Sequence, residues 1–162
     1  ALLRALSRLE HSNIKLQFIG NTCPELKQEI QQLNLGNKVM LKPYMPHIAS
    51  IAELQQSDLL LLVINQVANG KGIVPGKIFE YLGTRKPILC LGDPTGEAGE
   101  IIKTTNSGFC IAHHNEEEIF ILLSRLSSGV LPGLSFQTEQ FERKNETGQL
   151  CDIFNTLVNK PS

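Results

Sequence analysis

The feature of this sequence that most constrains its fold is a regular alternation of short apolar runs with amphipathic segments. The run over residues 59–64 (LLLLVI) is apolar at every position, which is typical of a strand buried on both faces. Each apolar run is followed by a segment whose apolar residues recur at helical spacing. Strands of this kind, separated by helices, predict an α/β fold with a doubly wound, Rossmann-like parallel sheet covered by helices on both faces.

Proline and glycine residues indicate where many of these elements begin and end. Strands are expected over residues 16–19, 38–41, 59–64, 87–91 and 109–112. Helices are expected from residue 2 onwards and over 24–35, 46–56, 75–84, 95–105 and 116–126, with Gly36 and Gly83 closing the second and the fourth. Parallel sheets bind ligands beyond the carboxyl ends of their strands, so the loops that follow the five strands are the expected location of a site.

Composition argues against several classes of protein. The 15 Lys and Arg residues nearly balance the 16 Asp and Glu residues, which speaks against a face that binds nucleic acid. The longest apolar run is far shorter than a membrane span. The four cysteines form no CxxC pair, so we expect structural thiols rather than metal ligands, in a protein of the cytoplasm.

The chain is expected to form one domain over residues 1–162 and to be a fragment of a longer, two-domain protein. A helical pattern starts at Leu2 with no Ser, Asp or Pro before it to cap the helix. Residues 129–137 are expected to be a linker to a closing helix over residues 138–159. The apolar stripe of that helix is expected to pack against the domain, or to form a homodimer of the fragment: Phe141, Leu150, Phe154 and Leu157.

The loop after the third strand is the most informative segment. It reads NQVANGKGIVPGKIF over residues 65–79, and its glycines lead into a helix whose amino end carries a partial positive charge. Lys71 and Lys77 add two ammonium groups, so the loop is suited to a phosphate or diphosphate. The alternative interpretation is a surface loop with solvated lysines. The loop has neither the GxGxxG nor the Walker spacing, which argues against a dinucleotide dehydrogenase and a P-loop kinase.

Glu80 lies one turn into the helix that follows this loop. A carboxylate at that position either complements the helix dipole or accepts hydrogen bonds from the two hydroxyls of a ribose. A diphosphate on the loop together with a ribose on Glu80 would form a consistent nucleoside-diphosphate site.

Residues 76–102, GKIFEYLGTRKPILCLGDPTGEAGEII, resemble the signature segment of the C-terminal, nucleotide-sugar-binding domain of GT-B glycosyltransferases, especially the retaining group 1 (family 4) enzymes. The upstream segment LKPYMPHIASIAELQQSDLLLLV and the final FERKNETGQLCDIFNTLV resemble other parts of the same domain. The resemblance covers residues 1–160. It is specific for the superfamily and leaves the base, the sugar and the acceptor open.

The resemblance implies that the chain binds the nucleotide-sugar donor of a metal-independent glycosyl transfer to an acceptor hydroxyl. Lys77 and Glu80 are the implied catalytic residues, and the donor is the implied ligand, with no further cofactor. The implied donor-binding residues are Gly70, Lys71, Gly72, Ile73, Val74 and Gly76 around the diphosphate, and Tyr44, Met45 and His47 near the base. The acceptor-binding N-terminal domain would be a partner outside this chain, and any association with a membrane surface would be through that part.

One departure from the family pattern leaves alternatives open. The first carboxylate of the family's Glu-x7-Glu motif would fall on Gly72, so a contact to the sugar is absent. A degenerate, non-catalytic interaction module and a sugar-nucleotide epimerase of GT-B shape therefore remain alternatives. Other polar residues are expected to be structural: Asp93 and Thr95 as helix caps, His113 and His114 as surface residues, and Glu116–Glu118 as charges that complement a helix dipole.

Overall fold

The computed structural model describes residues 1–67, 70–131 and 133–141. The strands are β1 (Leu16–Ile19), β2 (Val39–Lys42), β3 (Leu60–Val63), β4 (Ile88–Leu91) and β5 (Gly108–Ile111). The α-helices are α1 (Leu2–Ser7), α2 (Pro24–Gln32), α3 (His47–Gln56), α4 (Lys77–Thr84), α5 (Glu97–Thr104) and α6 (Glu116–Ser127). Two short 3-10 helices, η1 (Gly70–Gly72) and η2 (Glu139–Phe141), complete the described elements.

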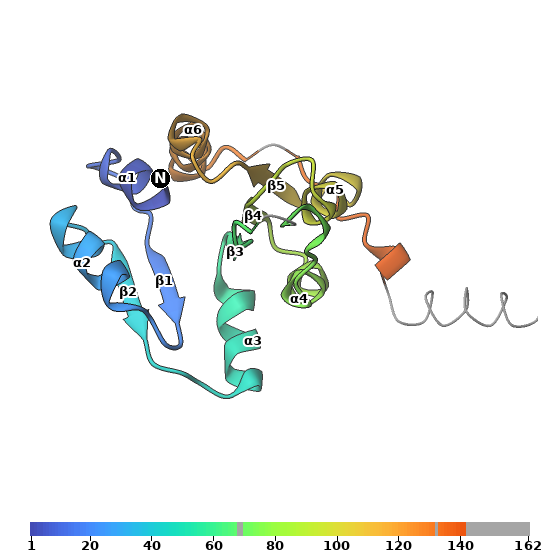
Figure 1. Cartoon of the computed structure of the whole chain (residues 1–162), viewed down its shortest axis with the longest axis horizontal. Helices are drawn as coiled ribbons and strands as arrows, with labels where there is room; N and C mark the ends of the chain where they lie inside the picture. The colour runs from blue at the N-terminus through green and yellow to red at the C-terminus, as the bar shows by residue number, and fades with distance from the viewer. Residues whose placement is uncertain (68–69, 132, 142–162) are drawn as a thin grey trace, which may run out of the picture.

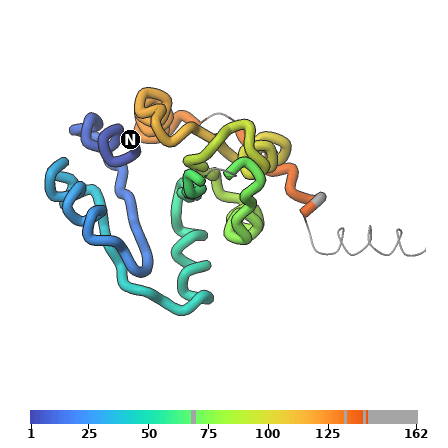
Figure 2. Tube along the Cα trace, viewed as in Figure 1, coloured from blue at the N-terminus to red at the C-terminus, as the bar shows by residue number. Residues whose placement is uncertain are grey.

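Every strand pair in the described residues is parallel, which confirms the predicted α/β, Rossmann-like class. The strands nevertheless form two sheets, β1-β2 and β3-β4-β5, where the sequence led us to expect one. Figure 1 shows the two sheets apart, with α3 running between them, and the tube in Figure 2 follows the same path. Figure 1 also places α4 and α5 beside the three-stranded sheet and α2 beside the two-stranded one.

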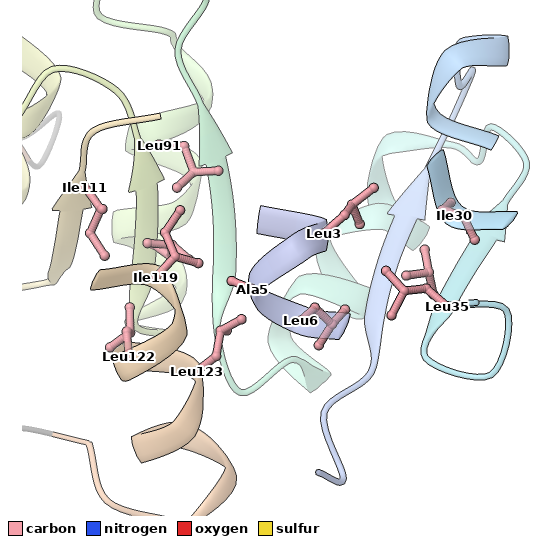
Figure 3. Packing of buried hydrophobic residues seen from close by; sticks show 12 residues of the cluster. Leu3, Ala5, Leu6, Ile30, Leu35, Leu91, Ile111, Ile119, Leu122 and Leu123 are labelled. Carbon is pink, nitrogen blue, oxygen red and sulfur yellow. The ribbon is translucent and has the colours of Figure 1, made fainter. Parts of the chain in front are cut away.

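Two apolar cores hold these layers together. The first core joins both sheets through α1, whose Leu3, Ala5 and Leu6 are buried. Figure 3 shows α1 between the sheets, with Ile30 and Leu35 on one side of it and α6 on the other. The second core lies between β3, β4 and the helices α4 and α5. It positions the beginning of α4, where the sequence predicts the site.

Two helices end at residues other than the predicted glycines. The α2 helix ends before Asn34, which has a left-handed φ of 54°, and Gly36 lies beyond it. The α4 helix continues through Gly83 and is capped by Arg85, also with a φ of 54°. Asparagine tolerates this conformation because its short polar side chain hydrogen-bonds locally. At Arg85, the hydrogen bond from its N–H to the Leu82 carbonyl (3.1 Å) accompanies the turn.

The segment after α6 returns across the end of α5. The N–H groups of Ser135 and Gln137 donate to the carbonyls of Asn106 and Thr105, and the Phe141 ring packs 5.7 Å from that of Phe79. Within the expected closing helix only residues 138–141 are described, and Glu139–Phe141 form a 3-10 turn. Leu150, Phe154 and Leu157 lie outside the described residues. No described helix combines the length and hydrophobicity that crossing a bilayer requires.

Candidate functional site

A cleft of about 1350 Å³ lies between the two sheets. Its walls come from β1, β3 and α3, and it extends to the beginning of α4. Five of the residues implied by sequence line it together: Tyr44, Met45, His47, Lys77 and Glu80. The side chains expected at the base and at the ribose thus share one cavity, although they lie more than thirty positions apart in the sequence.

The glycine-rich loop borders the beginning of α4. No side chain caps this helix, whose first turn is closed by the bonds from Ile78 N to Pro75 O and from Phe79 N to Gly76 O. A Cβ atom added at Gly72 or Gly76 would meet no atom within 4 Å, so the backbone there is open on its outer side. This openness leaves room for a ligand beside the backbone at these two positions.

The other loop residues implied by the sequence are not part of the cleft lining: Gly70, Lys71, Gly72, Ile73, Val74 and Gly76. Val74 packs against the core of β3 and α4, and the Ile73 side chain is 36% exposed. The backbone of Lys71 lies against the start of α5, because a Cβ at Gly96 would come 3.1 Å from the Lys71 carbonyl oxygen.

Lys71 forms an ion pair with Asp93, with 3.6 Å between Nζ and Oδ2. The same carboxylate accepts hydrogen bonds from the backbone N–H and the hydroxyl of Thr95, both at 2.8 Å. These bonds to Thr95, followed by the charge of Lys71, lower the pKa of Asp93. Asp93 therefore closes a turn before α5, whose N-cap is Gly96 rather than Asp93 or Thr95.

Lys77, Glu80 and Tyr81 form the α4 side of the cleft. The Lys77 ammonium lies 5.8 Å from the centre of the Tyr81 ring, and the Tyr81 hydroxyl donates to the Leu61 carbonyl at 3.3 Å. Burial, and secondarily the negative charge of Glu80, raise the pKa of Tyr81. Glu80 itself is exposed and has no ion-pair partner among the described residues. Its carboxylate is available to a ligand.

The opposite wall carries a polar network that the sequence analysis missed. Glu53 of α3 pairs with Lys42 at the end of β2 (2.8 Å) and accepts a hydrogen bond from the Gln17 amide of β1 (2.8 Å). The bond to Lys42, and then the bond to Gln17, lower the pKa of Glu53. Lys42 comes directly before the loop after β2, so its place at a carboxyl strand end was the available signal.

On the same wall, Tyr44 is 79% exposed, and His47 is the first residue of α3. An exposed aromatic ring at the mouth of a cleft offers a flat surface on which a nucleobase can stack.

The remaining candidates have structural roles. His113 is not simply a surface residue, because its Nε2 lies 2.7 Å from the Ile64 carbonyl and thereby links the ends of β5 and β3. Glu116 and Glu117 pair with Arg4 of α1 and with Arg8, the C-cap of that helix. Asn115 caps α6 by accepting a hydrogen bond from the Glu118 N–H. Among the described residues no group of His, Cys, Asp and Glu is arranged to hold a metal ion.

Cys90 and Cys110 are register partners on β4 and β5. A hydrogen bond with Cys110, together with burial, raises the pKa of Cys90, so this thiol stays neutral. Neither cysteine is in a disulfide, in agreement with the expected structural role.

Comparison with models of known protein families identifies a family for this chain. The sequence model of the family described as "Glycosyl transferases group 1" matches residues 1–129. No curated protein sequence matches the chain. The match includes the glycine-rich loop, the whole of α4 and every residue that lines the cleft except Leu131.

Proposed function

We propose, since the chain belongs to the group 1 glycosyltransferase family, that its cleft binds the nucleotide-sugar donor of a glycosyl transfer. The observation that carries the proposal is the exposed Glu80 carboxylate where the cleft meets α4. Lys77 lines the same part of the cleft, and no side chain caps the amino end of this helix. These groups supply hydrogen-bond acceptors and positive charge within one helical turn.

Charge decides which part of the ligand each group of the site would bind. An anionic diphosphate is stabilised by the N-terminal amides of α4 and by Lys77. A carboxylate beside it would repel phosphate oxygens, so Glu80 is assigned to the two hydroxyls of the ribose, which donate hydrogen bonds to it. The base would then extend toward Tyr44, Met45 and His47 on the opposite wall.

The reaction would be glycosyl transfer to an acceptor hydroxyl. The bond between the anomeric carbon and the diphosphate oxygen breaks, its electron pair stays on the diphosphate, and the acceptor oxygen bonds to the anomeric carbon. Amides and an ammonium group aimed at the departing diphosphate stabilise the charge that develops there. We assign this role to the start of α4 and to Lys77, without a metal ion, and place the acceptor site in a domain outside this chain.

Calorimetric titration with UDP, GDP and ADP tests the proposal. We expect at least one of the three to bind, and Glu80→Ala to weaken that binding by about 1–3 kcal/mol, the cost of leaving hydroxyls without acceptors. Glu97→Ala is the matched control, because Glu97 is an exposed carboxylate in the first turn of α5, outside the cleft. Equal effects of the two substitutions would reject the ribose assignment. A folded chain that binds none of the three nucleotides would reject the proposal.

Gly72 favours a second candidate function. Because it stands where the family pattern has its first carboxylate, a non-catalytic interaction module of the same fold is the alternative. A full-length protein that binds the nucleotide but neither transfers nor hydrolyses the sugar would favour the module.

The unpaired thiols Cys23, Cys90 and Cys110 support a reducing compartment, which we propose is the cytoplasm.

A further inference from the structure

Lys42, Glu53 and Gln17 form one polar cluster in the wall of the cleft. Lys42 Nζ lies 2.8 Å from Glu53 Oε1, and Gln17 Nε2 donates to Glu53 Oε2 at 2.8 Å. All three side chains line the cleft, as does Tyr44. The cluster therefore lies on the wall toward which the base would extend, and neither the diphosphate nor the ribose makes use of it.

The register of β1 and β2 brings two members of the cluster to one face of their sheet. Gln17 is the register partner of Met40, and Ile19 is that of Lys42. Alternate residues of a strand project from the same face, so Gln17 and Lys42 share a face. The bonds that Glu53 makes to both residues join α3 to this face of the sheet.

The side of α3 that lines the cleft is polar. Five of its lining residues lie three or four positions apart along the helix: His47, Ser50, Glu53, Leu54 and Ser57. Four of the five are polar, and no residue of α3 is buried. A helix that packed this side on a core would carry apolar residues there, so the side is suited to a polar ligand.

Each member of the cluster has hydrogen-bonding capacity beyond its bonds to the other two. An ammonium group has three N–H donors and a primary amide has two, and Lys42 and Gln17 each use one of them on Glu53. Each Glu53 oxygen accepts one of these bonds and retains a second lone pair. The Lys42 and Glu53 side chains are 35% and 30% exposed, so a ligand in the cleft can reach them.

The ionisation of Glu53 fixes the order of donors and acceptors along the cluster. The hydrogen bond from Lys42, and then that from Gln17, lower the pKa of Glu53, so its carboxylate is ionised at neutral pH and only accepts. The amide nitrogen of Gln17, rather than its oxygen, must then lie against this carboxylate. The cluster thus presents a donor, an acceptor and a donor in the order Lys42, Glu53, Gln17.

The four nucleobases differ in the order of the same groups along their Watson–Crick edges. Uracil presents an acceptor, a donor and an acceptor at O4, N3–H and O2, which complements the cluster at all three positions. Cytosine and adenine each place an amino donor against the ammonium and a ring nitrogen acceptor against the carboxylate. Guanine matches the first two positions, but its 2-amino group opposes the amide donor of Gln17.

We propose that this cluster selects uracil, so that the donor is a uridine diphosphate sugar. Lys42 donates to O4, Glu53 accepts from N3–H and Gln17 donates to O2, while the Tyr44 ring stacks on the base. Selectivity comes from the donors and acceptors that another base would leave opposed to their own kind in a partly buried site. The inference rests on the proposed function, because the diphosphate and the ribose at α4 direct the base to this wall.

Calorimetric titration of the chain with UDP, CDP, GDP and ADP tests the selectivity. UDP and CDP have the same shape and differ only at the N3 and C4 positions of the ring, so shape cannot explain a difference between them. We expect UDP to bind about tenfold or more tightly than each of the other three. UDP methylated at N3, which lacks the donor, should lose this advantage on the unsubstituted chain.

Glu53→Gln tests whether the cluster is the source of the selectivity. An amide can turn either its oxygen or its nitrogen toward the base, so it accepts from uracil or donates to cytosine. The ratio of UDP affinity to CDP affinity should therefore fall to near one. Glu100→Gln is the matched control, because Glu100 also pairs with a lysine, Lys103 (3.7 Å), and lies outside the cleft. The control should leave the ratio unchanged.

The outcomes separate this inference from the proposed function. A preference for CDP, GDP or ADP, equal affinity for UDP and CDP, full binding of the methylated nucleotide, or an unchanged ratio in folded Glu53→Gln would each overturn the selection of uracil. In all four cases a nucleotide still binds, so the proposed function stands. Binding of none of the nucleotides would reject both. Circular dichroism checks that Glu53→Gln folds, and if it does not, the methylated nucleotide on the unsubstituted chain decides.

Discussion

Gly108 is the first residue of β5 and the register partner of Ile88 on β4. A Cβ atom at Gly108 would lie far inside the contact distance of the Ile88 carbonyl oxygen and 2.7 Å from both the Ile88 nitrogen and carbonyl carbon. All three atoms belong to the backbone, so no flexible side chain can move aside. We therefore expect Gly108→Ala to force β4 and β5 apart.

The size of the effect follows from two contributions. Overpacking of a core costs about 1–3 kcal/mol, occasionally more. Separation of the strands would also weaken the neighbouring hydrogen bond from Ile88 N to Ser107 O (3.0 Å), worth about 1 kcal/mol. The expected loss in free energy of unfolding is therefore about 2–4 kcal/mol.

Urea unfolding followed by circular dichroism measures this loss. Gly83→Ala is the matched control, because a Cβ there meets nothing within 4 Å and the residue lies inside α4. Replacing a glycine by alanine inside a helix should stabilise by about 0.5–1 kcal/mol, so the two substitutions have opposite expected signs. If Gly108→Ala unfolded at the midpoint of the unsubstituted chain, the close approach of the two strands would be refuted.

Three further predictions concern single side chains. Asn115→Ala should lower the free energy of unfolding by about 1 kcal/mol in the same urea assay, because it removes the cap of α6; an unchanged midpoint would contradict that role. The pKa of Glu53 is lowered in the folded chain. Its pairing with Lys42 therefore stabilises the folded state at pH values above the ordinary carboxyl range, and this stabilisation is lost as the pH falls through the lowered pKa. The difference in thermal midpoint between Glu53→Gln and the unsubstituted chain should accordingly be larger at neutral pH than in acid. Lys77→Ala should weaken nucleoside-diphosphate binding more than Lys71→Ala in calorimetry, since Lys77 lines the cleft and Lys71 does not; the reverse order would move the diphosphate away from the cleft.

The strands were predictable because short runs of apolar residues indicate which segments are buried. The prediction for residues 59–64 contains β3, and the prediction for residues 16–19 coincides with β1. Helix starts marked by Pro24 and by the three glutamates after Asn115 were also found, since both signals act on the first turn. The glycine rule failed at Asn34 and Arg85, because in each case a residue with a side chain took the left-handed position two residues from the expected glycine.

The pairing of the strands was not predictable in the same way. Whether β1 lies beside β3 depends on which segments share an edge, and no local pattern of apolar residues encodes that.

The orientation of the two lysines also escaped prediction. They lie six positions apart, on the loop and at the first residue of α4, yet Lys71 pairs with Asp93 while Lys77 lines the cleft. The partner that decides this, Asp93, lies on another loop.

The short helix α1 touches both halves of the molecule through one small apolar surface, reinforced at its outer side by the ion pairs of Arg4 and Arg8 with α6. A molecule that bridged Tyr44 and Glu80 would form a second connection between the two halves, in addition to α1. Its binding should then be visible as a decrease in the radius of gyration, with the helical content unchanged.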